Sequence, residues 1–388
     1  MQKNNKYSKI LIIRTDRLGD CILSTPVPAV LKKIFPAAQI DVLTTPYTMD
    51  VFTNNPAISE VIIDDPKASI FSREFLALAG KIRANKYDVC YILHLTFRAA
   101  LLAFISGIPI RVSPASKIYQ FLSTNRIIQK RSSCQMNEAE YNVDLILKHL
   151  NIQNEQRSEN GNTKNSIINT ASSLYFDGAS DNFVNTFLNT EFHDKRKISY
   201  DEFKKSGKKM ITVHPGSGGS ALNMSADRYI ELMDKLFRNG YEVFLSTGPA
   251  EECLKNYYLS KLSFAPLCYR NDFFKASLSL KNTFALLDKS DAVIAPSTGI
   301  MHAAVALNKP VITVFCPIFV CVPKRWGPDP NARCQTAILM PEVKCGTADN
   351  IINEKYCKKC LKNNCMHYNC MDKIPISEVM DKLNLILK

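Results

Sequence analysis

Short apolar runs alternate with helical stretches over the first 150 residues. Residues 10–13 form a continuous apolar run typical of a buried strand, and a helix is predicted over 27–34, ending before Pro36. The same pattern predicts strands at 40–43, 61–63, 89–93 and 108–112, and a helix over 71–84. Apolar strands that alternate with helices predict a parallel sheet covered on both faces.

The alternation stops near residue 151 and resumes near 209. The interval 151–208 is rich in Asn, Ser, Lys and Glu, which predicts a polar linker or insertion, with a short helix over 180–189 capped by Ser180. Beyond it, strands are predicted at 210–213, 243–245, 292–294 and 311–315, and helices over 226–237, from 250 and from 299. The chain is therefore expected to hold two α/β domains, 1–150 and 209–388.

The composition is that of a water-soluble globular protein, with 46% hydrophobic and 22% charged residues in 388. The net charge of +13 suggests an anionic partner, although a solvated surface explains it equally well. Because the charges form no nucleic-acid motif, no nucleic acid is expected. The N-terminus has no secretory signal pattern, and the longest apolar stretch, 99–110, is too short to span a bilayer. These features predict a cytoplasmic protein that contacts a membrane peripherally.

The loop after the first predicted strand carries candidate catalytic chemistry. It reads Arg-Thr-Asp-Arg-Leu-Gly-Asp over 14–20, and Gly19 permits a tight turn before Asp20. Ligands of open parallel sheets bind beyond the carboxyl ends of strands, so Asp20 could serve as a general base. It could equally be a helix cap. Arg14 and Arg17 could keep Asp20 ionised or hold an anionic acceptor.

Two loops in the second half could hold phosphate. The stretch 214–220 reads His-Pro-Gly-Ser-Gly-Gly-Ser, and its backbone N–H groups are free to surround phosphate oxygens. The stretch 295–302 opens a helix whose dipole favours an anion. A flexible turn, a helix cap and a structural histidine are the simpler explanations. The candidate donor-binding residues here are Gly216, Ser217, Gly218, Gly219, Ser297, Thr298, Gly299 and His302.

Five segments together resemble glycosyltransferase family 9, the ADP-heptose:lipopolysaccharide heptosyltransferases. They are residues 12–20, 214–217, 248–252, 296–304 and 325–328, the last of which contains the only Trp. The resemblance implies the GT-B fold, in which two Rossmann-like parallel-sheet domains face an interdomain cleft. It also implies an inverting transfer that requires no metal or other cofactor.

The family's residue roles transfer to the matching positions. The resemblance implies that Asp20 is the catalytic base, and that the loops 216–219 and 297–302 contact the nucleotide sugar together with Glu251 or Glu252. Alone, those two glutamates could simply be first-turn helix acids. The implied donor is ADP-heptose or another nucleoside diphosphate sugar, and the implied acceptor is an anionic glycolipid such as lipopolysaccharide core.

The sequence departs from the family pattern at two places. The family commonly has a basic residue after its His-Pro-Gly-Ser loop, whereas residues 221–225 here read Ala-Leu-Asn-Met-Ser. Arg228, Lys324 and Arg325 are the candidates to replace that charge. Ser297 stands where some lipopolysaccharide heptosyltransferases carry an Asp that is thought to hold the sugar.

A cysteine-rich tail spans residues 345–371. Cys357, Cys360, Cys365 and Cys370 lie within 14 residues, a spacing that could bind structural zinc or an iron–sulfur cluster. Free thiols and disulfides are the alternatives, and a reducing cytoplasm disfavours disulfides.

Three functions fit these features. The first is transfer of a heptose-like sugar to lipopolysaccharide core or a related envelope glycan. The second is epimerisation of a nucleotide sugar by a GT-B enzyme, and the third is non-catalytic glycan binding or assembly. Fold alone does not separate them.

Overall fold

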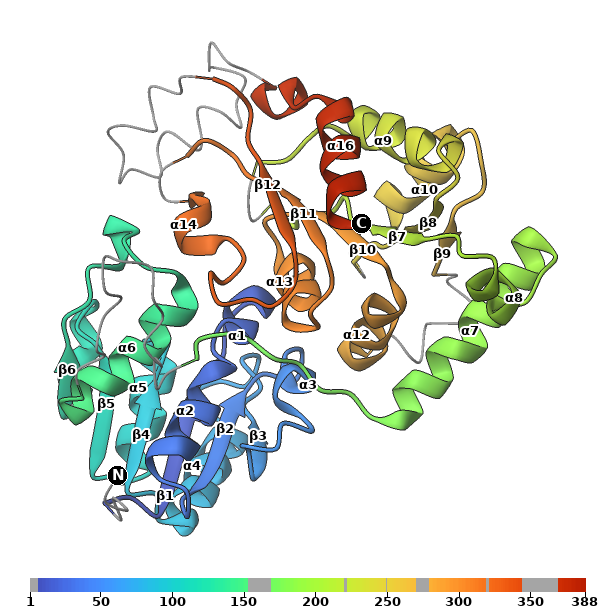
Figure 1. The fold of residues 1–388 in the computed structure, drawn as a ribbon. Coiled ribbons are helices and arrows are strands. Elements are labelled where there is room, and N and C mark those ends of the chain that lie inside the picture. Colours follow the sequence, from blue (N-terminus) through green and yellow to red (C-terminus); the bar gives the residue numbers. More distant parts are fainter. Residues whose placement is uncertain are drawn as a thin grey trace. The chain divides into compact units, whose positions relative to one another are not determined.

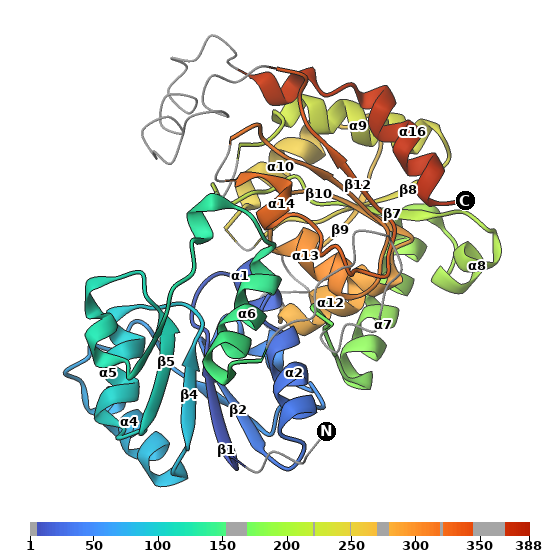
Figure 2. The same cartoon turned by 60° about the vertical axis from the view of Figure 1, so that its left-hand side comes forward.

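The chain forms two compact units, Met1–Tyr175 and Phe176–Lys388 (Figure 1). The computed structural model describes residues 6–152, 169–219, 222–248, 250–269, 279–318, 321–343 and 369–388. Each unit contains a six-stranded parallel sheet with helices packed on both faces (Figures 1 and 2). The prediction of two Rossmann-like parallel-sheet domains is confirmed.

The first sheet has the strand order β3-β2-β1-β4-β5-β6. Its strands are β1 (Lys9–Ile13), β2 (Gln39–Thr44), β3 (Glu60–Ile63), β4 (Val89–Ile92), β5 (Ile110–Pro114) and β6 (Asn125–Ile127). The chain leaves β1 toward β2 on one side and later returns to β4 on the other. The loops after β1 and β4 therefore separate at the carboxyl edge, a topological switch point where ligands of such sheets bind.

Helices cover both faces of this sheet. They are α1 (Leu18–Ile22), α2 (Pro26–Ile34), α3 (Met49–Phe52), α4 (Arg73–Asn85), α5 (Phe97–Ile105), α6 (Glu138–Leu150), and the 3₁₀ turns η1 (Ile118–Leu122) and η2 (Arg131–Ser133). Cys90 and Ile92 of β4 pack in one core with α4 and α5, whereas Tyr91 between them bonds to His149 of α6. Helices α5 and α6 thus lie on opposite faces, as the alternation of side chains along a strand requires.

The second sheet has the order β12-β11-β10-β7-β8-β9. Its strands are β7 (Met210–Val213), β8 (Glu242–Leu245), β9 (Leu267–Cys268), β10 (Ala292–Pro296), β11 (Val311–Val314) and β12 (Thr336–Leu339). Its helices are α7 (Gly178–Arg196), α8 (Tyr200–Lys205), α9 (Ala226–Arg238), α10 (Glu252–Lys261), α12 (Leu280–Lys289), α13 (Gly299–Ala306), α14 (Pro323–Trp326), α16 (Ile376–Ile386) and the 3₁₀ turn η4 (Cys370–Lys373). The switch point here lies between β7 and β10.

The interval predicted as a polar linker contains ordered structure. Helices α7 and α8 belong to the second unit, where Phe187, Phe192 and Phe203 pack in a core with Phe244 of β8. The helix predicted over 180–189 is longer at both ends, and its cap is Asp177, whose side chain accepts from the Ser180 N–H, rather than Ser180 itself. Buried aromatic side chains spaced along α7 outweigh the polar composition of this interval.

No helix in the described part of the chain is both long and apolar enough to cross a membrane. The apolar stretch 99–110 is divided between two elements, because it contains the end of α5 and the first residue of β5.

Candidate functional site

A buried arginine organises the carboxyl end of β1. Arg14 is 2% exposed and follows the strand directly, with its N–H bonded to the Leu43 carbonyl of β2. Its guanidinium donates to Asp16 at 2.7 Å, to Asp20 at 2.8 Å and to the Asn142 side chain of α6 at 3.2 Å. One fixed cation therefore orients both acidic residues of the loop.

Asp20 is not a helix cap. Arg17 occupies the N-cap position of α1, without a side-chain capping bond, and Asp20 lies in the first turn. One carboxylate oxygen of Asp20 accepts from Arg14, and the other has no hydrogen-bond partner among the described residues. The side chain is 21% exposed, so this second oxygen can meet a ligand.

The environment of Asp20 opposes its negative charge. Burial raises the pKa of Asp20 to about 6, with further repulsion from Asp16 and Glu138, although Arg14 and Arg17 act in the opposite direction. Burial also acts to lower the pKa of Arg14, but Asp16 and Asp20 outweigh it and the pKa rises. A carboxylate with a pKa near neutrality, held by a permanently charged guanidinium, suits a general base.

Both oxygens of Asp16 have a close neighbour. One accepts from Arg14, and the other lies 3.1 Å from Nδ1 of His94. Burial lowers the pKa of His94 despite the adjacent Asp16. The sequence did not single out His94, although it follows β4 across the switch point, and the order of the strands was the missing information. Asp16 is a positioning residue in this geometry, and Asp20 has the available oxygen.

Arg17 is the available cation of this loop. Its side chain is exposed and forms no ion pair or hydrogen bond with the described residues. Of the two arginines that could hold an anionic acceptor, Arg14 is committed to the carboxylates and Arg17 is not.

The loop after β7 is fixed at its base and open at its tip. His214 is buried, with its N–H on the Ile294 carbonyl and its Nδ1 3.2 Å from the Ser246 hydroxyl. Gly218 and Gly219 have φ values of 53° and 71°, and a Cβ on either would meet no atom within 4 Å among the described residues. The tip can therefore present backbone N–H groups to a ligand.

Gly216 makes room for a carboxylate. A Cβ at this position would collide with both carboxylate oxygens of Glu251, which also accepts a 2.7 Å hydrogen bond from the Gly248 N–H. Glu251 takes the N-cap position of α10, whereas Glu252 is exposed in its first turn, 4.0 Å from Lys255. Because a phosphate would be repelled by Glu251, this part of the site is better suited to ligand hydroxyl groups.

The loop after β10 places a hydroxyl at a helix N-terminus. Thr298 is the N-cap of α13, yet its Oγ1 is buried and makes neither a capping bond nor any other hydrogen bond with the described residues. His302 is buried one turn later, and burial lowers its pKa to about 4, so the ring is neutral at pH 7. Thr298 can bond an oxygen-rich ligand, whereas His302 cannot supply a positive charge.

The proposed substitutes for the missing basic residue differ in placement. Arg228 is used internally, since it donates to the Ile374 carbonyl at 2.7 Å and pairs with Glu231. Arg325 stacks on Trp326, with its guanidinium carbon 4.5 Å from the ring centre. Arg228 is therefore not a phosphate ligand, and Lys324 and Arg325 of α14 remain the candidates.

The metal prediction for the tail falls mostly outside the described residues. Cys357, Cys360 and Cys365 lie outside, and Cys370 opens η4. Within the described ranges no group of three or more His, Cys, Asp or Glu could hold a metal ion.

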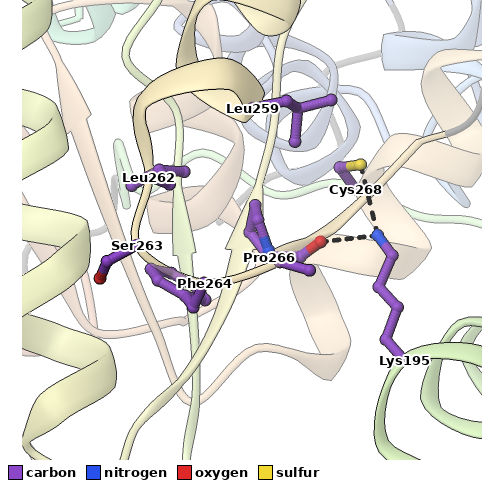
Figure 3. A pocket seen from close by; sticks show the side chains of 8 residues that line it. Lys195, Leu259, Leu262, Ser263, Phe264, Pro266 and Cys268 are labelled. Carbon is purple, nitrogen blue, oxygen red and sulfur yellow. Dashed lines mark hydrogen bonds between the residues drawn. The ribbon is translucent and has the colours of Figure 1, made fainter.

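A separate pocket of about 500 Å³ lies at the amino end of β9 (Figure 3). Lys195 enters it from α7 and donates to the Pro266 carbonyl at 2.6 Å and to the Cys268 thiol at 3.5 Å. Glu191 neutralises this lysine at 2.7 Å. The remaining walls are largely apolar, and the pocket faces the sheet edge opposite to the glycine-rich loop, so we assign it no part in the chemistry.

Comparison with known proteins identifies the family. The family model "Glycosyltransferase family 9 (heptosyltransferase)" matches residues 75–365, about three quarters of the chain. The chain belongs to glycosyltransferase family 9. A Haemophilus influenzae protein, provisionally named a glycosyltransferase, is 32% identical over 337 residues, which cover 87% of this chain and 90% of that protein. This enzyme is thus a glycosyltransferase, which separates it from the epimerase and the non-catalytic alternatives.

Solved structures of family members share the fold. A family 9 glycosyltransferase from Veillonella parvula matches with a TM-score of 0.75 and 18% identity, covering 99% of this chain and 98% of that one. The Escherichia coli ADP-heptose lipopolysaccharide heptosyltransferase II matches with a TM-score of 0.67 and 20% identity, covering 98% of each chain. The family 9 enzyme therefore has the GT-B fold.

Proposed function

We propose that this enzyme transfers a heptose-like sugar, with inversion, from a nucleoside diphosphate to lipopolysaccharide core or a related envelope glycan. The observation that carries the proposal is the geometry of Asp20, one oxygen of which is fixed by Arg14 while the other is available at the switch point. A heptosyltransferase among the relatives of the same fold supports the sugar class.

In this reaction Asp20 is the catalytic base. The acceptor hydroxyl oxygen attacks the anomeric carbon, its proton passes to the available Asp20 oxygen, and the bond from that carbon to the diphosphate breaks. Positioned base catalysis of this kind contributes about 10²–10⁴-fold. Asp16 and Arg14 orient the base, because both are bonded within the same cluster.

The second unit binds the donor. Backbone N–H groups of Gly218 and Gly219 and the N-terminus of α13 would face the diphosphate. Thr298 would donate its hydroxyl, which has no partner within the described ranges. Glu251 would accept hydrogen bonds from hydroxyl groups of the ribose or the sugar. Hydrogen bonds and helix dipoles then stabilise the leaving diphosphate without a metal ion. ADP-heptose is the proposed donor, because the Escherichia coli relative is named for it.

The acceptor is an anionic glycolipid bound by the first unit, with Arg17 as one cation that recognises it. A lipid acceptor places the enzyme at the cytoplasmic face of a membrane as a peripheral protein. The net charge of +13 is compatible with that location.

A thermal-shift panel of nucleotide sugars tests the donor assignment. A ligand present at 100 times its dissociation constant stabilises a protein by about 2.7 kcal/mol, so a true donor raises the melting temperature measurably. ADP-heptose should do so, and the same protein should then form a new glycoside with release of ADP. If no nucleotide diphosphate sugar raises the melting temperature, the proposal fails.

A further inference from the structure

One stretch of the first unit carries charge of a single sign. Between Asp88 and Glu138 the sequence contains no acidic residue and six basic ones: Arg98, Arg111, Lys117, Arg126, Lys130 and Arg131. Three of these are engaged inside the domain, Arg98 by Asp64, Arg131 by Glu138 and Arg111 by backbone carbonyls. The other three are exposed, and their side chains make no ion pair or hydrogen bond with the described residues.

Large apolar side chains are exposed beside these cations. Ile118 and Phe121 of η1 are 87% and 62% exposed, and Ile128 is 75% exposed just after β6. Single exposed apolar residues are ordinary on protein surfaces. Three of them among three exposed cations, on one short stretch of chain, indicate an interaction surface.

The topology brings these residues to one face. Turn η1 connects β5 to β6 and packs on α5, where Tyr119 meets Phe97 edge to face with ring centres 6.2 Å apart. Gln129 is directed to the other face, because it donates to the Tyr141 carbonyl and to Asp144 of α6. Alternation along the chain that leaves β6 directs Arg126 and Ile128 to the face opposite Gln129, the face of α5. Lys130 begins the turn into η2 and is exposed beside them.

We propose that this "β6 surface", made of Lys117, Ile118, Phe121, Arg126, Ile128 and Lys130, docks the enzyme on an anionic lipid surface. Basic residues interleaved with apolar ones suit such a surface, because the cations meet the headgroups while the apolar side chains enter the interface. A two-fold contact with a second copy through this surface would bring these cations against one another. Nucleic acid would not use Ile118 and Ile128, which have no ring to stack on bases.

The β6 surface adjoins the catalytic cluster. Lys130 is followed by Arg131, whose guanidinium lies 3.4 Å from the Asn142 side-chain oxygen that also accepts from Arg14. The strands of this sheet are parallel, so Ile128 and Lys130, just beyond β6, lie toward the same edge as Asp20, beyond β1. Docking would therefore present a lipid-borne acceptor near the base, a consequence that rests on the proposed function.

Vesicle flotation of the full chain tests the docking. The protein should float with vesicles of phosphatidylcholine and phosphatidylglycerol in equal parts, less with phosphatidylcholine alone, and less as salt increases. Each cation near such a surface contributes about fivefold in affinity, so Lys117→Gln with Lys130→Gln should weaken binding roughly 25-fold. Ile118→Ser with Phe121→Ser should also weaken binding while leaving its salt dependence in place.

Matched variants elsewhere in the first unit serve as controls. Lys33→Gln with Lys67→Gln removes two exposed cations, and Phe71→Ser removes an apolar side chain that is 87% exposed, all outside the β6 surface. These should bind vesicles like the parent. Equal flotation of the β6-surface variants and the controls would overturn the inference, as would equal binding to both kinds of vesicle. A change in oligomeric state without a change in flotation would also overturn it, in favour of a self-contact.

The outcomes separate this inference from the proposed function. Vesicle binding needs neither donor nor acceptor. If the protein floats with anionic vesicles but binds no nucleotide sugar, the proposed function is wrong and the docking surface is supported. If the protein transfers sugar to a delipidated acceptor but does not bind anionic vesicles, the docking surface is wrong and the proposed function is supported.

Discussion

Replacing Asp20 by Asn should make the enzyme more stable and nearly inactive. The exchange keeps the size of the side chain and an oxygen that can accept from Arg14, but removes the charge. The pKa of Asp20 is raised from 3.8 to about 6, and one unit corresponds to about 1.4 kcal/mol. Ionised Asp20 therefore destabilises the folded enzyme by up to about 3 kcal/mol, and Asp20→Asn removes that cost.

The stability gain should depend on pH with a defined sign. The folded state binds the Asp20 proton more tightly than the unfolded state, so this group stabilises the fold at low pH and the contribution is lost as the pH rises through about 6. The variant and the parent should therefore melt together near pH 4. At pH 7 to 8 the variant should melt about 6 °C higher, at roughly 2 °C per kcal/mol for a domain of this size.

The activity should change in the opposite direction. Single-turnover transfer should fall about 10²–10⁴-fold with donor affinity unchanged. The parent should lose kcat/KM about tenfold per pH unit below an apparent pKa near 6, because only the ionised base accepts the proton. Asp50→Asn is the control, since Asp50 is also a first-turn aspartate, of α3 in the same domain. An Asp20→Asn enzyme that is as active as the parent, or less stable at pH 7, refutes the reasoning.

Three further predictions concern the donor domain. Gly218→Asn should weaken nucleotide diphosphate binding about tenfold, as measured by calorimetry. Gly207→Asn is the control, because Gly207 also has a positive φ and open space around it but precedes β7, and this variant should keep the parent affinity. Equal effects of the two substitutions would show that the loop 214–220 is not part of the donor site. Gly216→Ala should displace Glu251 from the Gly248 N–H. If Glu251 binds ligand hydroxyl groups, this variant should lose more affinity for ADP than for inorganic pyrophosphate, which has no sugar. An equal loss for both ligands would contradict that role of Glu251. Transfer should persist in excess EDTA, and loss of transfer that magnesium restores would contradict metal independence.

Most strands of the two sheets could be predicted from apolar runs, with boundaries off by at most two residues. The run at 108–112, for example, became β5 at Ile110–Pro114. Strands β6, β9 and β12 were missed for a different reason. β9 has only two residues and β6 three, which is too short for any periodicity. β12 lies at the edge of its sheet and alternates exposed and buried side chains; its short apolar run, residues 337–339, was overlooked.

The candidate site was predicted in its residues but not in its contacts. Asp20 and the second-domain loops stand beside recognisable strands and glycines. The bonds that define their roles join distant parts of the chain, such as Arg14 to Asn142, or depend on packing, such as the fit of Glu251 against Gly216. Local patterns cannot reveal that the Thr298 hydroxyl has no hydrogen-bond partner among the described residues, because this depends on the side chains that neighbouring elements place around it.

The charge balance around Arg14 favours a catalytic explanation over a structural one. Asp16 alone would neutralise the buried guanidinium, from which it accepts a 2.7 Å hydrogen bond. Adding Asp20 places a second carboxylate in a partly buried cluster where burial and like charge raise its pKa to about 6. A cluster selected only for stability would omit this group, since its ionised form costs free energy at neutral pH. Proteins retain such costs where function requires them, and a base must stay ionised yet bind a proton readily.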